Sequence, residues 1–290
     1  MSWRTVVISN SAKLDYQMGY LVVRRTDTVR IHITEIETLL IESTAVSLTA
    51  ALLSELIKKK VKVIFCDEKR NPSAELVPYY GSHDTSAKVR QQIQWSQDIK
   101  TAVWTEIVQE KISKQAEHLE YRRRPEAEML RSYIGEIEFG DSTNREGHAA
   151  KVYFNALFGM DFSRTADCSI NAALNYGYGI ILSCFTREIA ANGYITQLGL
   201  FHDNMFNQFN LASDFMEPFR PIVDRKVVQM HPEKFEHDEK MDILMALQDS
   251  VWIGGRQEIV SNAIKIYCRS IFNALNDNDP ALIKFYRNEL

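Results

Sequence analysis

The chain has 290 residues, of which 45% are hydrophobic and 25% are charged, and its formal net charge is −4 at pH 7. This composition is ordinary for a soluble globular protein of one large or two ordinary domains. No apolar run approaches the roughly 18 residues of a membrane span, and residues 1–7 lack the layout of a signal peptide. We therefore expect a cytoplasmic protein with no membrane partner. Because no segment is strongly basic, nucleic-acid binding would need local basic patches, a dimer or a basic partner.

The four cysteines predict neither a zinc knuckle nor a disulfide scaffold. They are widely scattered and form no Cys-x-x-Cys pair, standing at Cys66, Cys168, Cys184 and Cys268. Buried free thiols are the expected state for such residues in the cytosol.

The first 75 residues predict a small β-rich domain with one helix. Apolar or alternating runs favour strands over 3–8, 29–33, 39–41 and 61–66, and residues 14–23 suggest a hairpin with its turn near 17–19. Leucines and isoleucine at helical spacing predict a helix over 47–60. Residues 71–81 contain Pro72, Pro78 and Gly81, which is typical of a domain boundary, and we place the linker at 76–84.

Beyond the linker the pattern is almost wholly helical, so we expect an α+β protein whose larger domain, 85–290, is all-α. A single long amphipathic helix is predicted over 85–119, which contains neither Gly nor Pro. Shorter helices are predicted over 126–137, 143–158, 170–191, 205–210, 241–252 and 258–276, with an extension of the 205–210 helix through 214–230 left open.

Three separate segments supply carboxylates and one imidazole. Glu146 lies in the first, His202 follows the apolar run 197–201, and Asp214 and Glu217 lie three residues apart in the third. Hard divalent cations prefer oxygen ligands, and a single histidine in such a set still favours Mg²⁺ or Mn²⁺. The arrangement suggests metal-assisted phosphodiester chemistry.

Glu146 and its neighbours also have structural explanations. Thr143 and Glu146 fit a capping box, in which the glutamate reaches back to the helix N-terminus. His148 would point away from Glu146 on a helix, so we expect a packed or backbone-bonded histidine there. His202, at the end of an apolar run, is equally consistent with a hydrogen-bonded structural residue.

The third segment has its own alternatives. On a helix, Asp214 and Glu217 share one face, where a metal or a nearby cation would offset their repulsion. The structural explanation is that Asp214 caps a helix and Glu217 is solvated. Arg220, three residues further on, could pair with Glu217 or hold a phosphate.

Taken together, these segments closely resemble the CRISPR spacer-acquisition integrase family, and its type II branch is the most similar. The resemblance rests on residues 144–150, on Phe201 with His202, and on 211–224. The opening residues 3–7, the strand at 63–67 and Trp104 are also similar to that family. The likeness extends over essentially the whole chain.

The resemblance implies a β-rich domain that serves as a dimerisation and DNA platform, followed by a helical catalytic domain. It places metal ligands at Glu146, His202 and Glu217, with Mg²⁺ or Mn²⁺ as the cofactor. The third ligand is often aspartate in the family, so Glu217 is a conservative variant. A further family aspartate matches Asp214, which would bind metal or relay a proton.

The implied reaction is attack by the 3′-hydroxyl of a captured DNA fragment on a phosphodiester at the edge of a CRISPR repeat. Implied partners are double-stranded DNA with free 3′ ends, CRISPR repeat DNA, a second copy in a homodimer, and a small adaptation protein that bridges two dimers. An effector nuclease is a further candidate partner. We expect Arg145, Lys151 and Arg220 to contact phosphates.

Two other functions remain open at this point. A metal-dependent, structure-specific DNA endonuclease would use the same residues with water as the nucleophile. A non-catalytic DNA-end-binding scaffold would use the carboxylates only as caps and ion-pair partners.

Overall fold

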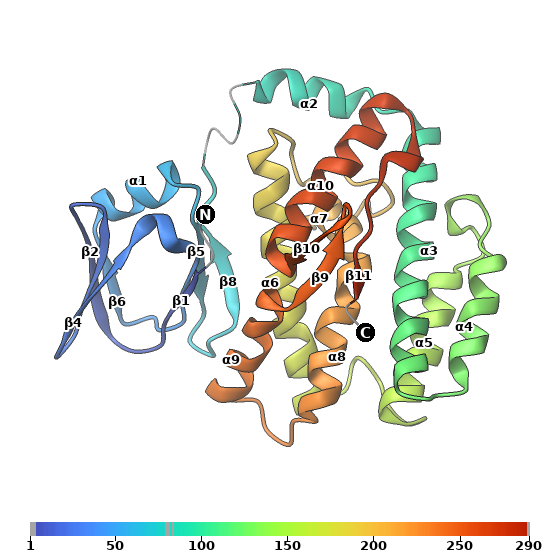
Figure 1. Ribbon diagram of the computed structural model, residues 1–290, viewed down its shortest axis with the longest axis horizontal. Helices are drawn as coiled ribbons and strands as arrows, with labels where there is room; N and C mark the ends of the chain where they lie inside the picture. The colour runs from blue at the N-terminus through green and yellow to red at the C-terminus, as the bar shows by residue number, and fades with distance from the viewer. Residues whose placement is uncertain (1–3, 79–81, 83, 289–290) are drawn as a thin grey trace. The chain divides into compact units, whose positions relative to one another are not determined.

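The computed structural model describes residues 4–78, 82 and 84–288, and the chain forms two compact units, Met1–Tyr79 and Tyr80–Leu290 (Figure 1). The division between them falls inside the 76–84 segment that the sequence suggests as a linker. Strands gather in the first unit and helices dominate the second, so the α+β organisation is confirmed. Trp3 and Gly81, used in the sequence predictions, lie outside the described residues.

The first unit contains two four-stranded sheets within its described residues. Its elements are β1 (Arg4–Ile8), β2 (Ala12–Gln17), β3 (Tyr20–Arg24), β4 (Thr28–His32), β5 (Ile36–Ile41), β6 (Val46–Leu48), α1 (Ala50–Lys58), β7 (Lys62–Cys66) and β8 (Pro72–Glu75). One sheet has the order β1-β5-β7-β8 and the other β4-β3-β2-β6. All six residues of β5 are buried because it lies between two parallel neighbours.

The predicted hairpin is confirmed by the antiparallel pairing of β2 with β3. Met18 and Gly19 form its two-residue turn with φ of 48° and 89°, the left-handed values that such a turn requires. The expectation of a boundary over 71–81 is wrong at its start, because Pro72–Glu75 pairs with β7 as an edge strand. Proline is tolerated at the first position of such a strand, where its missing N–H is not needed.

The second unit is mostly helical. Its helices are α2 (Thr85–Ile93), α3 (Gln97–Tyr121), α4 (Glu126–Gly135), α5 (Arg145–Phe158), α6 (Ser169–Ala191), α7 (Asn210–Phe215), α8 (Arg220–Met230), α9 (His237–Met245) and α10 (Val260–Asp277). Its strands are β9 (Ser250–Ile253), β10 (Arg256–Ile259) and β11 (Arg287–Asn288), which form a sheet in the order β10-β9-β11.

The prediction of an all-α second domain is therefore wrong. Val251 and Ile253 are buried while Trp252 between them is exposed, which is the alternation of a strand and not of a helix. Gly254 and Gly255 follow with φ of 59° and 81°, so the chain turns back into β10. The helices expected over 241–252 and 258–276 consequently end at Met245 and begin at Val260.

Two further helix predictions are corrected. The expected helix over 85–119 is broken after Ile93, and Ser96 starts α3 by accepting a hydrogen bond from the Ile99 amide at 3.3 Å. Residues 205–209 form turns instead of a helix. Asn204 and Asn207 each accept a hydrogen bond from the backbone amide two residues on, at 2.9 Å, and this competes with helix formation.

Helix α3 is the main support of the candidate site. It packs against α4, α5, α8 and the 3₁₀ turn Glu217–Phe219 (Figure 1). Trp104, Val108, Lys111 and Gln115 recur at helical spacing on one buried face, so two polar side chains lie in an otherwise apolar stripe.

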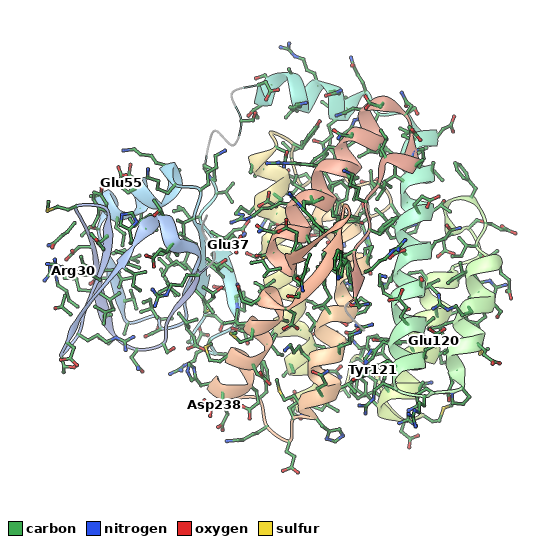
Figure 2. All side chains as sticks on the ribbon, viewed as in Figure 1. Arg30, Glu37, Glu55, Glu120, Tyr121 and Asp238 are labelled. Atoms are coloured by element: carbon green, nitrogen blue, oxygen red, sulfur yellow. The ribbon has the colours of Figure 1, made fainter. Side chains whose placement is uncertain are left out.

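The surface carries mixed charge in both units. Arg30 on β4, Glu120 at the end of α3 and Asp238 on α9 are exposed (Figure 2). In the described part of the chain, no helix combines the length and apolar character that crossing a bilayer demands.

Candidate active site

A pocket of about 250 Å³ in the second unit brings together all three predicted metal ligands, Glu146, His202 and Glu217. They come from α5, from the loop before α7 and from the 3₁₀ turn before α8. The pocket is also lined by three cations, a further acid and four aromatic rings, namely Lys111, Arg164, Arg220, Asp224, Trp104, Phe154, Tyr178 and Phe201. Segments far apart in the sequence thus form one polar cavity.

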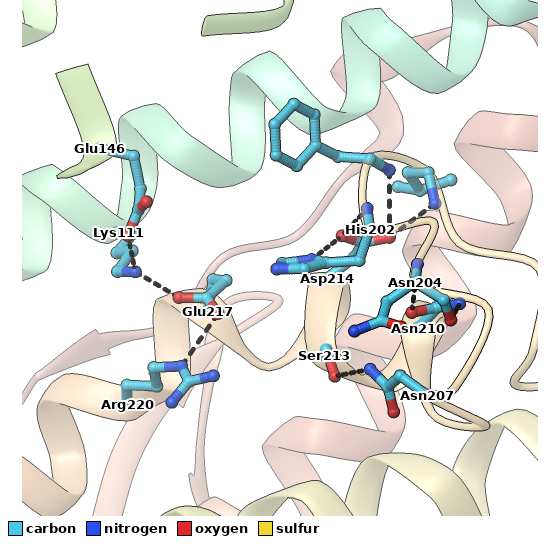
Figure 3. A network of polar contacts seen from close by, with 12 residues as sticks. Lys111, Glu146, His202, Asn204, Asn207, Asn210, Ser213, Asp214, Glu217 and Arg220 are labelled. Carbon is cyan, nitrogen blue, oxygen red and sulfur yellow. Dashed lines mark hydrogen bonds and ion pairs between the residues drawn. The ribbon is translucent and has the colours of Figure 1, made fainter. Parts of the chain in front are cut away.

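Lys111 lies between two of the predicted ligands. Its ammonium donates hydrogen bonds to Glu146 and to Glu217 (Figure 3), and the residue is only 6% exposed. Burial alone would lower the pKa of Lys111, but the charges of Glu217 and Glu146 outweigh it and raise that pKa. The lysine therefore stays charged and joins the two carboxylates.

The sequence reasoning missed Lys111. The available signal was its register, because it lies seven residues after Trp104 and three after Val108 on the apolar stripe of α3. A lysine in such a stripe is buried only where an acidic partner meets it. Lys114 repeats the pattern nearby, where it pairs with Glu110 and Glu117.

Glu217 is buried and held from two sides, so the suggestion that it is solvated is wrong. It is 4% exposed, and Arg220 Nε donates to it at 2.9 Å opposite Lys111. Burial acts to raise the pKa of Glu217, but Arg220 and Lys111 outweigh it and lower that pKa to about 2. The Arg220 guanidinium lies 4.6 Å above the Tyr178 ring, which fixes its plane.

The turn that carries Glu217 is also held by the C-terminal segment. Tyr286 donates its hydroxyl to the carbonyl of Pro218 at 3.0 Å, and its ring packs on Phe219 with centroids 4.7 Å apart. Pro218 interrupts the helical path between α7 and α8. Glu217 therefore lies at a fixed break between two helices, not on one continuous helical face.

The capping-box interpretation of Glu146 is wrong. The cap of α5 is Asn144, which has a φ of 54° and accepts from the Gly147 amide at 3.3 Å. Asp141 accepts from the amides of Arg145 and Glu146 at 2.7 and 3.0 Å. Because these groups satisfy the first turn, the Glu146 side chain is left to reach Lys111.

Asp214 holds the loop that carries His202. It is fully buried near the end of α7 and accepts from the backbone amides of Leu200, Phe201 and His202 at 2.6, 3.2 and 3.1 Å. The Nδ1 of His202 also lies 2.6 Å from Asp214 (Figure 3). This hydrogen bond raises the pKa of His202 against the opposing effect of burial.

The suggestion that Asp214 caps a helix start is therefore wrong, and it is absent from the described residues lining the pocket. With Nδ1 engaged, the Nε2 of His202 is the ring nitrogen left for a ligand in the pocket. His148, two residues after Glu146, is exposed, so of the two expected states, packed or backbone-bonded, the packed one is wrong.

Two aromatic rings support the His202 ring. Phe201 stacks on Trp104 with centroids 4.6 Å apart and an interplanar angle of 2°. The His202 ring meets Trp104 edge-on, with centroids 5.8 Å apart and an angle of 84°. Phe201 is nevertheless 57% exposed, so an apolar surface opens beside the polar pocket.

Of the three predicted phosphate contacts, only Arg220 lines the pocket. Arg145 pairs with Glu136 at 2.9 Å, and Lys151 is exposed on α5 outside the lining. Arg164, which the sequence reasoning did not single out, is in the lining and lies 5.5 Å from the centroid of the Tyr178 ring.

A buried hydrogen-bonded network extends from the pocket wall, where Asp224 and Tyr178 lie, into the core. Asp224 accepts hydrogen bonds from Tyr178 and Tyr153, and Nδ1 of His118 lies 2.7 Å from the Tyr153 hydroxyl. Burial raises the pKa of Asp224 to about 6 although both tyrosines oppose the shift. Burial, assisted by two arginines, lowers the pKa of His118 to about 3.

The donor chemistry of the pocket suits a divalent cation. Glu146 and Glu217 already converge on one positive charge, and His202 lines the same cavity. Two carboxylates and one imidazole are a set that Mg²⁺ or Mn²⁺ accepts. Among residues 4–78, 82 and 84–288, however, no three acidic, histidine or cysteine side chains lie close enough to hold a metal ion. In this arrangement the ammonium of Lys111 occupies the position between the carboxylates of Glu146 and Glu217.

The fold and the pocket define a class: an α+β protein whose helical unit carries an acidic, histidine-containing site. The family model described as CRISPR associated protein Cas1 matches residues 5–250, so the chain belongs to the Cas1 family. This confirms the family predicted from the sequence.

Named relatives agree with this assignment. The CRISPR-associated endonuclease Cas1 of Neisseria meningitidis serogroup C (strain 8013) is 34% identical over 235 residues, which cover 80% of this chain and 77% of the relative. A casposase bound to integration product has a similar fold, with a TM-score of 0.79, 18% identity, and coverage of 96% of this chain and 92% of the other. A Cas6-RT-Cas1–Cas2 complex matches with a TM-score of 0.75 and 16% identity, covering 99% of this chain and 36% of that longer chain.

Proposed function

We propose that this protein is a divalent-metal-dependent DNA integrase of CRISPR adaptation, which joins the 3′-hydroxyl ends of a captured DNA fragment to a CRISPR repeat by transesterification. The observation that carries the proposal is the convergence of Glu146, His202 and Glu217 on one pocket from three separate segments. Membership of the Cas1 family, an endonuclease relative and a casposase of similar fold support it.

Each side chain has a role that follows from its surroundings. Mg²⁺ or Mn²⁺ held by Glu146, His202 and Glu217 would lower the pKa of the attacking hydroxyl and offset charge at the phosphorus. Asp214 keeps the proton of His202 on Nδ1, so that Nε2 is free to act as a ligand. Glu217 stays ionised because its pKa is about 2. Arg220 uses Nε for Glu217, which leaves its other guanidinium nitrogens for a phosphate oxygen.

The partners form part of the proposal. We infer that the chain acts on double-stranded DNA with free 3′ ends and on repeat DNA as a homodimer, with a small adaptation protein bridging two dimers. The Cas1–Cas2 assembly of similar fold supports a protein partner. Because a net charge of −4 opposes binding to DNA, the proposal requires modest basic stripes that several subunits combine along the DNA.

An endonuclease is the second candidate function, and the name of the Neisseria relative favours it. The same residues would then activate water in place of a 3′-hydroxyl. The two candidates differ in one requirement, because only the integrase needs a free 3′-hydroxyl on the DNA fragment.

Strand transfer of a labelled duplex into a supercoiled, repeat-bearing plasmid tests the proposal. The assay includes the small partner protein and compares Mn²⁺ with EDTA, and 3′-hydroxyl with 3′-deoxy ends. We expect joining that needs both the metal and the hydroxyl, and that is lost in Glu146→Gln. Glu136→Gln, which removes a carboxylate outside the pocket lining, should remain active. Cleavage without joining would favour the endonuclease, and DNA binding indifferent to the metal would favour the scaffold.

A further inference from the structure

We propose that Lys111 is an internal counter-cation that competes with the divalent metal for Glu146 and Glu217, so that metal can bind only when the ammonium moves off the pair. This inference rests on the proposed function, because it concerns the same metal ligands. It assigns to Lys111 a positioning role that the sequence patterns did not suggest.

Lys111 neutralises the repulsion between Glu146 and Glu217. Two carboxylates that meet in a buried pocket repel each other unless a cation lies between them. Lys111 supplies that charge by donating to Glu146 and Glu217 at once (Figure 3). The acidic pair is therefore already assembled and compensated before any metal arrives.

Most of the carboxylate oxygens that a metal would use already accept hydrogen bonds. Glu217 gives one oxygen to Lys111 and the other to Arg220, so both are engaged. Glu146 also directs one oxygen at Lys111. A divalent ion that bridges Glu146 and Glu217 at the position of the ammonium has to displace at least one hydrogen bond of Lys111, because two cations cannot occupy the same position.

The side chain of Lys111 has more freedom to move than the backbone turn that carries Glu217. Lysine carries its charge on a flexible four-carbon stem. Glu217, by contrast, lies on a turn fixed by Pro218 and Tyr286. The pocket that Lys111 lines also contains Asp224, whose carboxylate offers the ammonium a third acidic neighbour besides Glu146 and Glu217.

The chain contains a matched control on the same helix. Lys114 is also buried on α3 between two glutamates, with Nζ 3.1 Å from Glu110 and 2.9 Å from Glu117. These partners are absent from the residues that line the metal pocket. Lys114→Met therefore removes a similar buried ion pair without touching the predicted ligands.

The test is Mn²⁺ binding to the DNA-free full chain, measured by calorimetry on wild type, Lys111→Met and Lys114→Met. We expect Lys111→Met to bind Mn²⁺ at least tenfold more tightly than wild type, while Lys114→Met binds like wild type. Adding Mn²⁺ should raise the melting temperature of Lys111→Met by more than it raises that of wild type. Adding Glu146→Gln to Lys111→Met should abolish the gain in affinity.

Lys111→Arg provides a second variant that keeps the charge, in case Lys111→Met fails to fold. It should bind Mn²⁺ no more tightly than wild type, whereas the neutral Lys111→Gln should bind it more tightly. If the neutral variants bind Mn²⁺ equally or more weakly than wild type, or bind none, the inference is overturned. Strand transfer that persists in EDTA would instead overturn the proposed function, so the two failures can be told apart.

Discussion

Asp214 binds the ring of His202 and the backbone of the same loop with one carboxylate. Its Oδ1 lies 2.6 Å from Nδ1 of His202 and 3.1 Å from that residue's amide nitrogen, while Oδ2 accepts from Leu200 and Phe201. The orientation of the ring and the path of the loop therefore depend on a single buried side chain. Asp214 can thus act by positioning His202, the proposed metal ligand, without itself lining the pocket.

This relationship predicts the effect of Asp214→Asn. An amide cannot hold the Nδ1 proton of His202 as a carboxylate does, so we expect strand transfer to slow by about 10- to 100-fold. Nitrogen NMR of the His202 ring should show a changed tautomer. Asp203→Asn, on the same loop but exposed, is the control and should be active. An unchanged tautomer in Asp214→Asn would contradict the positioning role.

Arg220 should affect both stability and DNA binding. Arg220→Met removes one of the two cations that lower the pKa of Glu217, so we expect the free energy of unfolding to fall by roughly 1–3 kcal/mol. If Arg220 also contacts a phosphate, the slope of log affinity against log salt should decrease by about one. Arg220→Lys keeps the charge and should retain most of the salt dependence. A slope identical in Arg220→Met and wild type would exclude the phosphate contact.

The stack of Phe201 on Trp104 should matter more for activity than for stability. Phe201→Ala removes a ring that is 57% exposed, so we expect a loss of only about 1 kcal/mol from the aromatic pair. We expect a clear fall in the strand-transfer rate of Phe201→Ala, because His202 loses an aromatic neighbour. Phe201→Tyr keeps a ring at this position and should restore the rate. Phe206→Ala is the control, since Phe206 is 89% exposed on the same loop. Equal rates in the two alanine variants would argue against this role.

The pH dependence of stability should reveal His118. Its pKa is about 3 in the folded chain and near 6.5 when unfolded, so the unfolded state binds more protons between these values. The free energy of unfolding therefore carries the full benefit of neutral His118 above pH 6.5. As the pH falls toward 3, this part of the free energy is lost at up to about 1.4 kcal/mol per pH unit. The measurement is denaturant unfolding of wild type and His118→Gln from pH 7 to pH 4. We expect the difference between their free energies of unfolding to narrow or reverse as the pH falls.

Asp224 has the opposite effect on the pH dependence of stability over part of the range between pH 3 and 6.5. Its pKa is raised from 3.8 to about 6, so the folded state binds more protons there and stability falls as the pH rises through this window. The two groups partly cancel in wild type, which is why the variant is needed to separate them. A pH-independent difference between wild type and His118→Gln would show that His118 is not held neutral.

The sequence predicted the residue types of the site better than its geometry. Glu146, His202 and Glu217 stand out because carboxylates and an imidazole recur in distinctive segments, and all three line one pocket. Lys111 was missed because its partners lie on α5 and on a distant turn, and only the tertiary fold brings them within reach. The register of Lys111 on α3 indicates only that the lysine is buried, and which carboxylates meet it depends on the tertiary fold.

The errors in the fold have similarly local causes. The helix predicted over 241–252 overlaps strand β9 at residues 250–252, although Gly254 and Gly255 indicate a hairpin turn directly after it. The helix predicted over 205–210 is wrong for residues 205–209, where the side chains of Asn204 and Asn207 hold the chain in turns. Strand β8 begins at Pro72, and a proline at that place indicates a domain boundary more readily than a strand.

The contact between Tyr286 and Pro218 has a consequence for biosynthesis. The hydroxyl that holds the turn beside Glu217 belongs to a residue translated 68 positions after Pro218. During synthesis the ribosome must complete α10 and the segment beyond it before that turn gains its support. The acidic pair should therefore become ordered late, after most of the helical unit has left the ribosome, which leaves the nascent chain without a finished active site.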